Sequence, residues 1–300
     1  MSKFWCHSHA EALYIDPMEQ NRLPDKLICA RYRHLSERIN ALPQITTGEE
    51  IIRVKMPSTY GTYKYRKVFP NSPKRAHYEQ LLALSLKLKT ERDQLIAQWN
   101  ANHDVPIATA AAGISIADRN DGILTIQNYN SWAEYSNSHP ITTEYTSDGK
   151  RYRSRIELMT AETLKDLGLE WKYEPLISLN APSRFAGDNT TVEFTPDFAV
   201  AVRELGRVFL IECLGMLSES SYANDAFDKL KIYSYNGVYP GRDLTLISGD
   251  KNYMPSMEAI AQSVRSTLGI LCAESIRSSN EGAPPQSKES ALTSAGSLTS

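Results

Sequence analysis

Two stretches of the chain, Thr195-Pro196-Asp197-Phe198 and Phe209-Leu210-Ile211-Glu212-Cys213-Leu214-Gly215, predict the centre of its fold. Both are apolar and strand-like, and each carries one carboxylate. Strand interiors disfavour Asp, and a buried charge without compensation is unfavourable. A divalent cation held between Asp197 and Glu212 would compensate both charges. The acids are 15 positions apart (197 to 212), so one strand can run out, turn at Glu204-Leu205-Gly206 and return beside the other.

The order and spacing of these motifs resemble the core of the PD-(D/E)xK nuclease superfamily. In that superfamily the Asp after a Pro and the Glu of the next strand bind the metal, a Glu on a preceding helix assists, and a Lys polarises the attacking water. The resemblance covers roughly residues 145 to 250 and implies metal-binding roles for Asp197 and Glu212. It also identifies Glu157, in Tyr152-Arg153-Ser154-Arg155-Ile156-Glu157, with the catalytic helix Glu.

The superfamily's Lys is missing from its usual position, because Leu214 stands two residues after Glu212. One branch has the pattern Glu-His-x-Gly here and takes its lysine from the following helix. Glu212-Cys213-Leu214-Gly215-Met216-Leu217 resembles that pattern, with Cys213 in place of the His. The resemblance therefore implies that Lys229 is the catalytic lysine. Lys231 is the rival, but two positions on it points away from the same helix face.

Helix and strand signals around these motifs predict the fold class. A helix is expected from Ser154, where Glu157 follows as in a capping box, to a stop at Gly168. Strands are expected at 171–179, 192–202, 208–213 and 244–247, with a helix over 222–235 before the last strand. This order predicts an α/β fold with a restriction-endonuclease-like mixed central sheet flanked by helices. The capping box gives Glu157 an alternative role, which is only to cap its own helix.

A smaller α+β region is expected in the N-terminal part of the chain. A helix is predicted over 25–42, a hairpin over 51–69 about Ser58-Thr59-Tyr60-Gly61, and a long helix over 74–100. Between residues 51 and 92 only Glu79 and Glu91 oppose a group of basic residues, and aromatic residues are interleaved with them. The basic residues are Arg53, Lys55, Lys64, Arg66, Lys67, Lys74, Arg75, Lys87, Lys89 and Arg92. Such a surface favours nucleic-acid or partner contact, and a solvated charged face is the equal alternative.

The rest of the chain is predicted from turn and composition signals. Ile114-Ser115-Ile116 and residues 123–126 flank an Asp-Gly sequence and predict a second hairpin. A polar linker is expected over 129–140 and a tip of a hairpin at 147–150. The predicted layout is an N-terminal segment (1–50), the basic region (51–130), the nuclease-like domain (140–272) and a disordered tail (273–300) rich in Ser, Gly, Pro and Ala.

Composition limits the class of protein and its setting. The chain has 300 residues, of which 41% are hydrophobic and 23% charged, and these values are ordinary for a globular protein with a sizeable core. The net charge of −2 means that any basic surface is local. The four cysteines form no CxxC pair, and we find neither a signal peptide nor an apolar run of membrane-spanning length. We therefore expect a cytoplasmic protein without a membrane partner.

The sequence thus predicts a Mg²⁺- or Mn²⁺-dependent endonuclease acting on DNA. Asp197, Glu212 and the backbone carbonyl of Cys213 would hold the metal, and Lys229 would orient the attacking water. Two alternatives stay open: a degenerate nuclease fold that binds nucleic acid or a protein partner without cutting, and an interaction protein whose buried acids are structural. Cutting both strands with one site would favour a homodimer or a protein partner.

Overall fold

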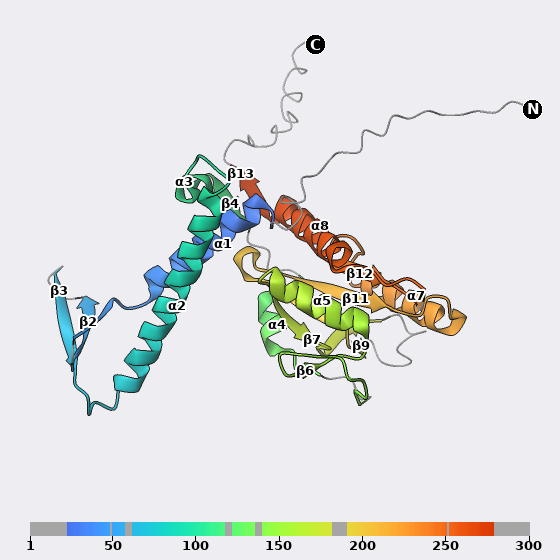
Figure 1. Ribbon diagram of the computed structural model, residues 1–300, viewed down its shortest axis with the longest axis horizontal. Coiled ribbons are helices and arrows are strands. Elements are labelled where there is room, and N and C mark those ends of the chain that lie inside the picture. Colours follow the sequence, from blue (N-terminus) through green and yellow to red (C-terminus); the bar gives the residue numbers. More distant parts are fainter. Residues whose placement is uncertain are drawn as a thin grey trace, which may run out of the picture.

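The computed structural model describes residues 23–48, 50–57, 62–117, 122–135, 140–181, 191–250 and 252–278. These residues form a mixed α/β protein with several small sheets (Figure 1). The largest sheet has four strands in the order β12-β11-β10-β7, in which β7, β10 and β11 are antiparallel and β12 runs parallel to β11. Their bounds are β7 (Glu170–Tyr173), β10 (Phe198–Val202), β11 (Arg207–Leu214) and β12 (Leu244–Ser248). The predicted mixed sheet between helices is therefore present in these strands.

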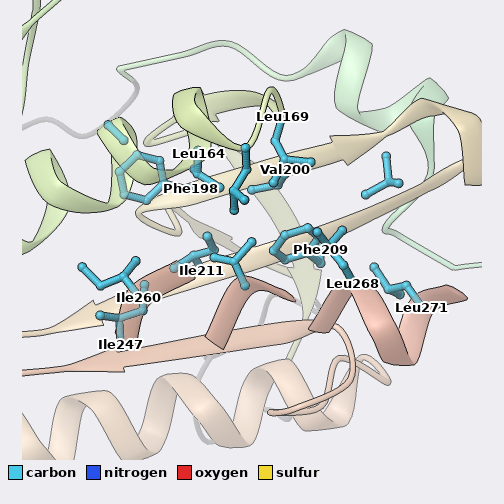
Figure 2. Packing of buried hydrophobic residues seen from close by; sticks show 14 of the residues in the cluster. Leu164, Leu169, Phe198, Val200, Phe209, Ile211, Ile247, Ile260, Leu268 and Leu271 are labelled. Carbon is cyan, nitrogen blue, oxygen red and sulfur yellow. The ribbon is translucent and has the colours of Figure 1, made fainter. Parts of the chain in front are cut away.

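Strand β11 lies inside this sheet, and its residues from Arg207 to Cys213 are all buried. Such a continuous run is typical of a strand covered on both faces. On one face Phe209 and Ile211 pack against Leu164 and Leu268, which belong to helices α5 (Arg155–Asp166) and α8 (Met257–Ser275) (Figure 2). Each such buried apolar side chain stabilises the fold by about 1.5–3 kcal/mol.

The other face of the sheet packs against helices α4 (Ile126–Ser131) and α7 (Ser220–Tyr235). Leu210 of β11 belongs to the same buried cluster as Tyr129 of α4 and Tyr233 of α7. Alternate residues of β11 therefore face different helices, as the two-residue period of a strand requires. This alternation directs Glu212, two residues after Leu210, towards α7.

The N-terminal part of the described chain contributes helices and a three-stranded sheet. It contains α1 (Asp25–Ala41), β1 (Ile45–Thr47), β2 (Ile52–Pro57), β3 (Tyr63–Val68), α2 (Arg75–Asn100) and α3 (Ile107–Ala112). The predicted helices and the pairing of β2 with β3 are confirmed, and β1 adds a third strand to that sheet. The predicted turn at 58–61 lies outside the described residues. In Figure 1 the three-stranded sheet lies at the end of α1 and α2 that is far from β10 and β11.

Several short elements complete the fold. They are β4 (Ile114–Ile116), β5 (Thr146–Ser147), β6 (Lys150–Arg151), β8 (Ile177–Asn180), β9 (Thr191–Phe194), the 3-10 turn η1 (Arg203–Leu205) and β13 (Ile276–Ser278). Pairing of β5 with β6 confirms the hairpin tip expected at 147–150. Among the described helices, none combines the length and the apolar character that crossing a membrane requires.

The second predicted hairpin is wrong. Strand β4 pairs with β13, near the end of the described chain, and not with residues 123–126. Thr125 caps helix α4 instead, because its hydroxyl accepts a hydrogen bond from the backbone of Asn128. Helix α4 also replaces the first part of the linker expected over 129–140, with Tyr129 buried.

The predicted start of the disordered tail at residue 273 is also wrong. Helix α8 continues to Ser275 and β13 follows it directly, while residues 279–300 lie outside the described part of the chain. Packing crosses the predicted domain boundaries as well, since Leu27 and Ala30 of α1 belong to the same buried cluster as Phe209.

Two of the predicted long strands are each two strands in different sheets. Residues 171–179 divide into β7 and β8, and residues 192–202 divide into β9 and β10. The breaks fall at Pro175 and Pro196, since proline lacks the N–H group that a sheet ladder needs. Glu174, before the first proline, has a φ of 44°, which turns the chain sharply. The second break releases Asp197 from regular strand geometry.

Candidate active site

The two predicted metal-binding acids lie beside each other in the chain path of two neighbouring strands, since Asp197 directly precedes β10 and Glu212 belongs to β11. Phe198 of β10 pairs with Ile211 of β11, and each acid is the next residue from this pair. The structure thus brings the two acids to the same end of this strand pair.

Asp197 is a buried acid whose environment opposes its ionisation. Burial first, and then the charge of Glu212, raise the pKa of Asp197 well above its usual value, although Lys229 opposes this shift. Its Oδ2 accepts a hydrogen bond from the backbone N–H of Cys213 at 2.6 Å. This bond ties the residue just before β10 to β11 and holds the Asp197 carboxylate at the backbone next to Glu212.

Glu212 has two partners on helix α7. Its Oε1 lies 2.7 Å from Lys229 Nζ and accepts a 2.6 Å hydrogen bond from the hydroxyl of Tyr233. Its Oε2 accepts a 2.8 Å bond from the same ammonium group. Lys229 and Tyr233 are four residues apart, so they share one face of α7. One helix face therefore supplies both groups that hold the Glu212 carboxylate.

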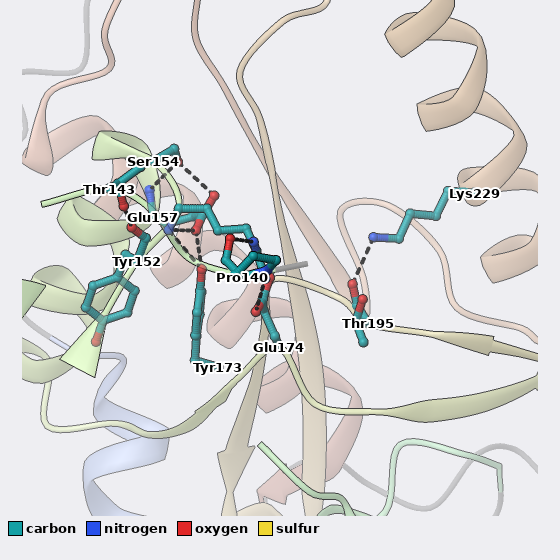
Figure 3. A network of polar contacts seen from close by, with 10 residues as sticks. Pro140, Thr143, Tyr152, Ser154, Glu157, Tyr173, Glu174, Thr195 and Lys229 are labelled. Atoms are coloured by element: carbon teal, nitrogen blue, oxygen red, sulfur yellow. Dashed lines mark hydrogen bonds and ion pairs between the residues drawn. The ribbon is translucent and has the colours of Figure 1, made fainter. Parts of the chain in front are cut away.

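Lys229 is a cation at the centre of this group. Its Nζ also donates to the carbonyl of Thr195 at 3.2 Å, just before Asp197 (Figure 3). Burial would lower the pKa of Lys229, but the charges of Glu212 and Asp197 outweigh burial and raise that pKa above its usual value. The ammonium therefore stays protonated at neutral pH. Lys231 instead forms an exposed ion pair with Asp228, so of the two lysines Lys229 alone reaches Glu212.

Glu157 is held in a separate hydrogen-bonded network (Figure 3). The predicted N-cap of α5 is confirmed, because the Ser154 hydroxyl accepts from the Glu157 N–H at 3.2 Å. The Glu157 carboxylate accepts from the Ser154 hydroxyl at 2.8 Å, the Arg153 N–H at 2.9 Å and the Tyr173 hydroxyl at 2.5 Å. Its charge still contributes to the raised pKa of Asp197, after burial and Glu212. Glu157 thus acts on Asp197 through space and is fixed by its own cap.

Cys213 turns its side chain towards α5, away from the face of Glu212. Its Sγ lies 3.6 Å from the hydroxyl of Thr160. Burial, followed by the charge of Asp197, raises the pKa of the Cys213 thiol well above its usual value, so the thiol stays protonated. A protonated thiol is a poor ligand, and sulfur matches a hard cation poorly. The predicted role of the Cys213 backbone carbonyl as a metal ligand stays a prediction.

The donor set at this site fits Mg²⁺ and not zinc. Within the described residues there is no group of three or more His, Cys, Asp or Glu side chains that could hold a metal ion. Structural zinc needs about four such ligands. Mg²⁺ is usually held by only one or two carboxylates and takes its other ligands from water and substrate phosphates. The carboxylates of Asp197 and Glu212 would be enough for such a site.

Three tyrosines at the site were not predicted as functional residues. Tyr233 bonds Glu212, and Tyr173 bonds Glu157. Burial raises the pKa of Tyr222, and the charges of Asp197 and Glu212 raise it further. The spacing of Tyr222, Lys229 and Tyr233 by seven and then four residues indicates one helix face, and that signal is present in the sequence. No comparable spacing indicated a role for Tyr173, because the strand predicted over 171–179 did not include the break at Pro175.

Comparisons with protein-family models, with curated proteins and with solved structures found no match to this chain.

Proposed function

We propose that this chain is a Mg²⁺- or Mn²⁺-dependent endonuclease that hydrolyses phosphodiester bonds in DNA, on a fold of the restriction-endonuclease type. One observation carries the proposal: Asp197 bonds the backbone N–H of Cys213, the residue after Glu212, and the ammonium of Lys229 lies 2.7 Å from Glu212. The PD-(D/E)xK resemblance implies this arrangement, in which two acids and one lysine converge at one end of a strand pair.

Each residue has a specific part in this proposal. Asp197 and Glu212 would hold the metal, which when bound would neutralise charge on the phosphate and lower the pKa of the attacking water. Lys229 brings a permanent positive charge that stabilises negative charge on phosphate oxygens. Tyr233 holds Glu212 in position by its 2.6 Å hydrogen bond. Glu157 adds negative charge behind Asp197 and fixes the start of α5.

The charge balance of the site supports a dication. Asp197 and Glu212 carry two negative charges when ionised, and Lys229 is their one close cation among the described hydrogen bonds and ion pairs. Burial, followed by the charge of Glu212, raises the pKa of Asp197 well above its usual value, and Lys229 only partly opposes this shift. A divalent cation favours ionised Asp197 and must displace its proton, so metal affinity increases with pH.

A nicking assay with supercoiled plasmid tests this function. Wild-type protein should nick DNA with Mg²⁺ or Mn²⁺ and lose this activity in EDTA. Asp197→Ala, Glu212→Ala and Lys229→Ala should each abolish nicking, while the matched control Lys231→Ala should leave it unchanged. Cleavage that persists unchanged in Asp197→Ala and Glu212→Ala would refute this site.

A nuclease fold that binds nucleic acid or a protein partner without cutting is the second candidate. It is favoured by the full occupation of Glu212, whose two oxygens already bond Lys229 and Tyr233. Salt-sensitive DNA binding without cleavage in any divalent metal would support it.

The setting that we propose is the cytoplasm. Cys29, Cys213 and Cys272 are free and buried, and this fits a reducing compartment. One site of this kind cuts one strand at a time, so double-strand cleavage would require a homodimer or a protein partner.

A further inference from the structure

The three-stranded sheet of β1, β2 and β3 has two faces of different character. One face packs against the start of α2, where Ile52, Val54 and Val68 form a buried cluster with Tyr78. The register opposes Ile52 and Val68, so these residues share that face. The other face consists of the alternate residues, which the same buried cluster does not include.

Cations and aromatic rings make up this second face, which we call the outer face. It carries Arg53, Lys55, Tyr63, Tyr65 and Lys67. The tyrosines are 65% and 59% exposed, and Arg53 and Lys67 are exposed as well. None of the three strands contains an acidic residue, so no carboxylate of the sheet balances these charges.

Two positive charges lie directly opposite each other on the outer face. Arg53 of β2 pairs with Lys67 of β3 in the sheet register. Like charges in directly opposed positions destabilise a sheet. A bound polyanion would relieve this repulsion, so the pairing favours a negatively charged partner over an uncharged one.

The tyrosines favour unpaired bases over a duplex. Tyr63 and Tyr65 are two residues apart on one strand, so their rings project from the same face about 7 Å apart. The Lys55 ammonium lies 3.9 Å from the centre of the Tyr63 ring, which places a phosphate-binding charge beside an exposed aromatic surface. Aromatic side chains beside cations are the usual means of binding single-stranded nucleic acid, since each unpaired base can stack on a ring.

We propose that the outer face of the β1–β3 sheet binds single-stranded DNA, with Tyr63 and Tyr65 stacking on bases and Arg53, Lys55 and Lys67 neutralising phosphates. The role of this binding in DNA cleavage rests on the proposed nuclease function, but the binding itself requires no cleavage. Helix α2 has 26 residues and is about 40 Å long, and the sheet packs at its start. The outer face would therefore hold DNA at a distance from β11, the strand that carries Glu212 (Figure 1).

Fluorescence anisotropy with a labelled 20-nucleotide oligo-dT and with a 20-base-pair duplex, both in EDTA, tests this inference. The wild-type chain should bind the single strand more tightly than the duplex. Tyr63→Ala/Tyr65→Ala should weaken binding of the single strand by about tenfold or more. The control Tyr235→Ala/Tyr239→Ala removes two exposed tyrosines at the end of α7 and beyond it, and should keep wild-type affinity.

A matched pair of charge variants tests whether the outer face, and not the opposite face, binds the DNA. Arg53→Gln/Lys67→Gln removes one Arg and one Lys from the outer face, and Lys64→Gln/Arg66→Gln removes one of each from the opposite face of the same hairpin. The first variant should lower the slope of log K against log salt by about 1.4, and the second by less than half of that. Circular dichroism of each variant checks that the sheet still folds.

Three results would each overturn the inference. They are equal losses of salt slope in the two charge variants, tighter binding of the duplex than of the single strand, and wild-type affinity in Tyr63→Ala/Tyr65→Ala. Asp197→Ala separates it from the proposed function. If this variant binds oligo-dT with full affinity, the inference stands whether or not the wild-type chain cleaves DNA. If affinity disappears with Asp197, the binding surface is the nuclease site and the inference fails.

Discussion

Two lysine–tyrosine pairs of the described chain, one on helix α7 and one on the three-stranded sheet, lie in different surroundings. On helix α7, Lys229 lies 6.0 Å from the centre of the Tyr233 ring, and both side chains bond the buried carboxylate of Glu212. On the three-stranded sheet, Lys55 lies 3.9 Å from the Tyr63 ring, and the sheet has no acid in its strands. The presence or absence of a carboxylate partner determines what each lysine can bind. Lys229 is committed to an internal acid, whereas Lys55 is accessible to an external anion.

Burial separates the two pairs as well. Tyr233 is fully buried and Tyr63 is 65% exposed. In a buried site the interaction of charges is strong, because the surroundings screen it weakly. At an exposed site a single charge contributes little to stability and acts through its attraction for phosphates. The variants below are expected to separate these two kinds of lysine–tyrosine pair.

Glu212→Gln is expected to give the largest effect. The amide keeps a hydrogen-bond acceptor for Tyr233 but removes the charge that would hold the metal. Cleavage of plasmid DNA should fall by about 10³-fold or more, since metal-bound charge stabilisation is worth several kcal/mol. The comparison variant Lys55→Gln, measured at saturating DNA, should retain the wild-type rate. A Glu212→Gln protein that cleaves at the wild-type rate would remove the distinction between the pairs.

Lys229→Met should lower the free energy of unfolding by about 2–3 kcal/mol, because it leaves Glu212 buried without its cation. We place the effect below that of a fully buried pair because the Lys229 side chain is 26% exposed. Lys55→Met should change stability by less than about 0.5 kcal/mol. Urea unfolding in EDTA measures both variants. The double variant Lys229→Met/Glu212→Gln should recover much of the stability lost in Lys229→Met. If the losses of the two single variants simply add in the double variant, Lys229 and Glu212 are not coupled.

Asp197→Asn should give a smaller effect that depends on pH. A carboxyl group whose pKa is raised by folding stabilises the protein fully below its unfolded pKa, and this contribution is lost as pH rises through the folded pKa. The amide variant avoids that loss. In EDTA at pH 8 its Tm should therefore be a few degrees higher than that of the wild type, and the difference should shrink towards pH 4.

Added Mg²⁺ gives the control for this measurement. It should raise the Tm of the wild type at pH 8 and leave that of Asp197→Asn nearly unchanged, because a ligand stabilises only a protein that binds it. A wild type whose Tm exceeds that of Asp197→Asn at pH 8 in EDTA would contradict the buried, unfavourable charge.

Cys213→Ala is expected to give the smallest effect on function. The side chain faces Thr160 and not Glu212, so removing it should leave the cleavage rate within about twofold and reduce stability by about 1 kcal/mol. Rates in Mg²⁺ and Mn²⁺, together with urea unfolding, measure the two effects. A loss of cleavage in Cys213→Ala with unchanged stability would show that the thiol takes part, against this account.

The sequence predicted the parts of the fold that depend on continuous local patterns. The apolar run of β11, the Ser154 cap and the long helix α2 each carry a complete signal within a few residues. The candidate site depended on more than local patterns: Asp197, Glu212 and Lys229 were named from the resemblance to the nuclease superfamily. In the structure Asp197 bonds the backbone beside Glu212, and Lys229 bonds Glu212 itself.

Predictions that depended on distant partners were less successful. Strand β4 pairs with β13, more than 150 residues away in the chain, and no turn signal indicates such a partner. Likewise, the hydrogen bond of Tyr173 to Glu157 follows from the packing of α5 on β7 and not from any spacing in the sequence. Pro175 and Pro196 were the one available signal for the divided strands, and a stricter use of that signal would have predicted both breaks.

Diffraction from crystals soaked in Mn²⁺ tests whether Asp197 and Glu212 together hold a divalent ion. Anomalous density is expected within about 2.3 Å of a carboxylate oxygen of each residue, and none in Glu212→Gln crystals. Soaked crystals without this density, in which Lys229 still bonds Glu212, would contradict the claim.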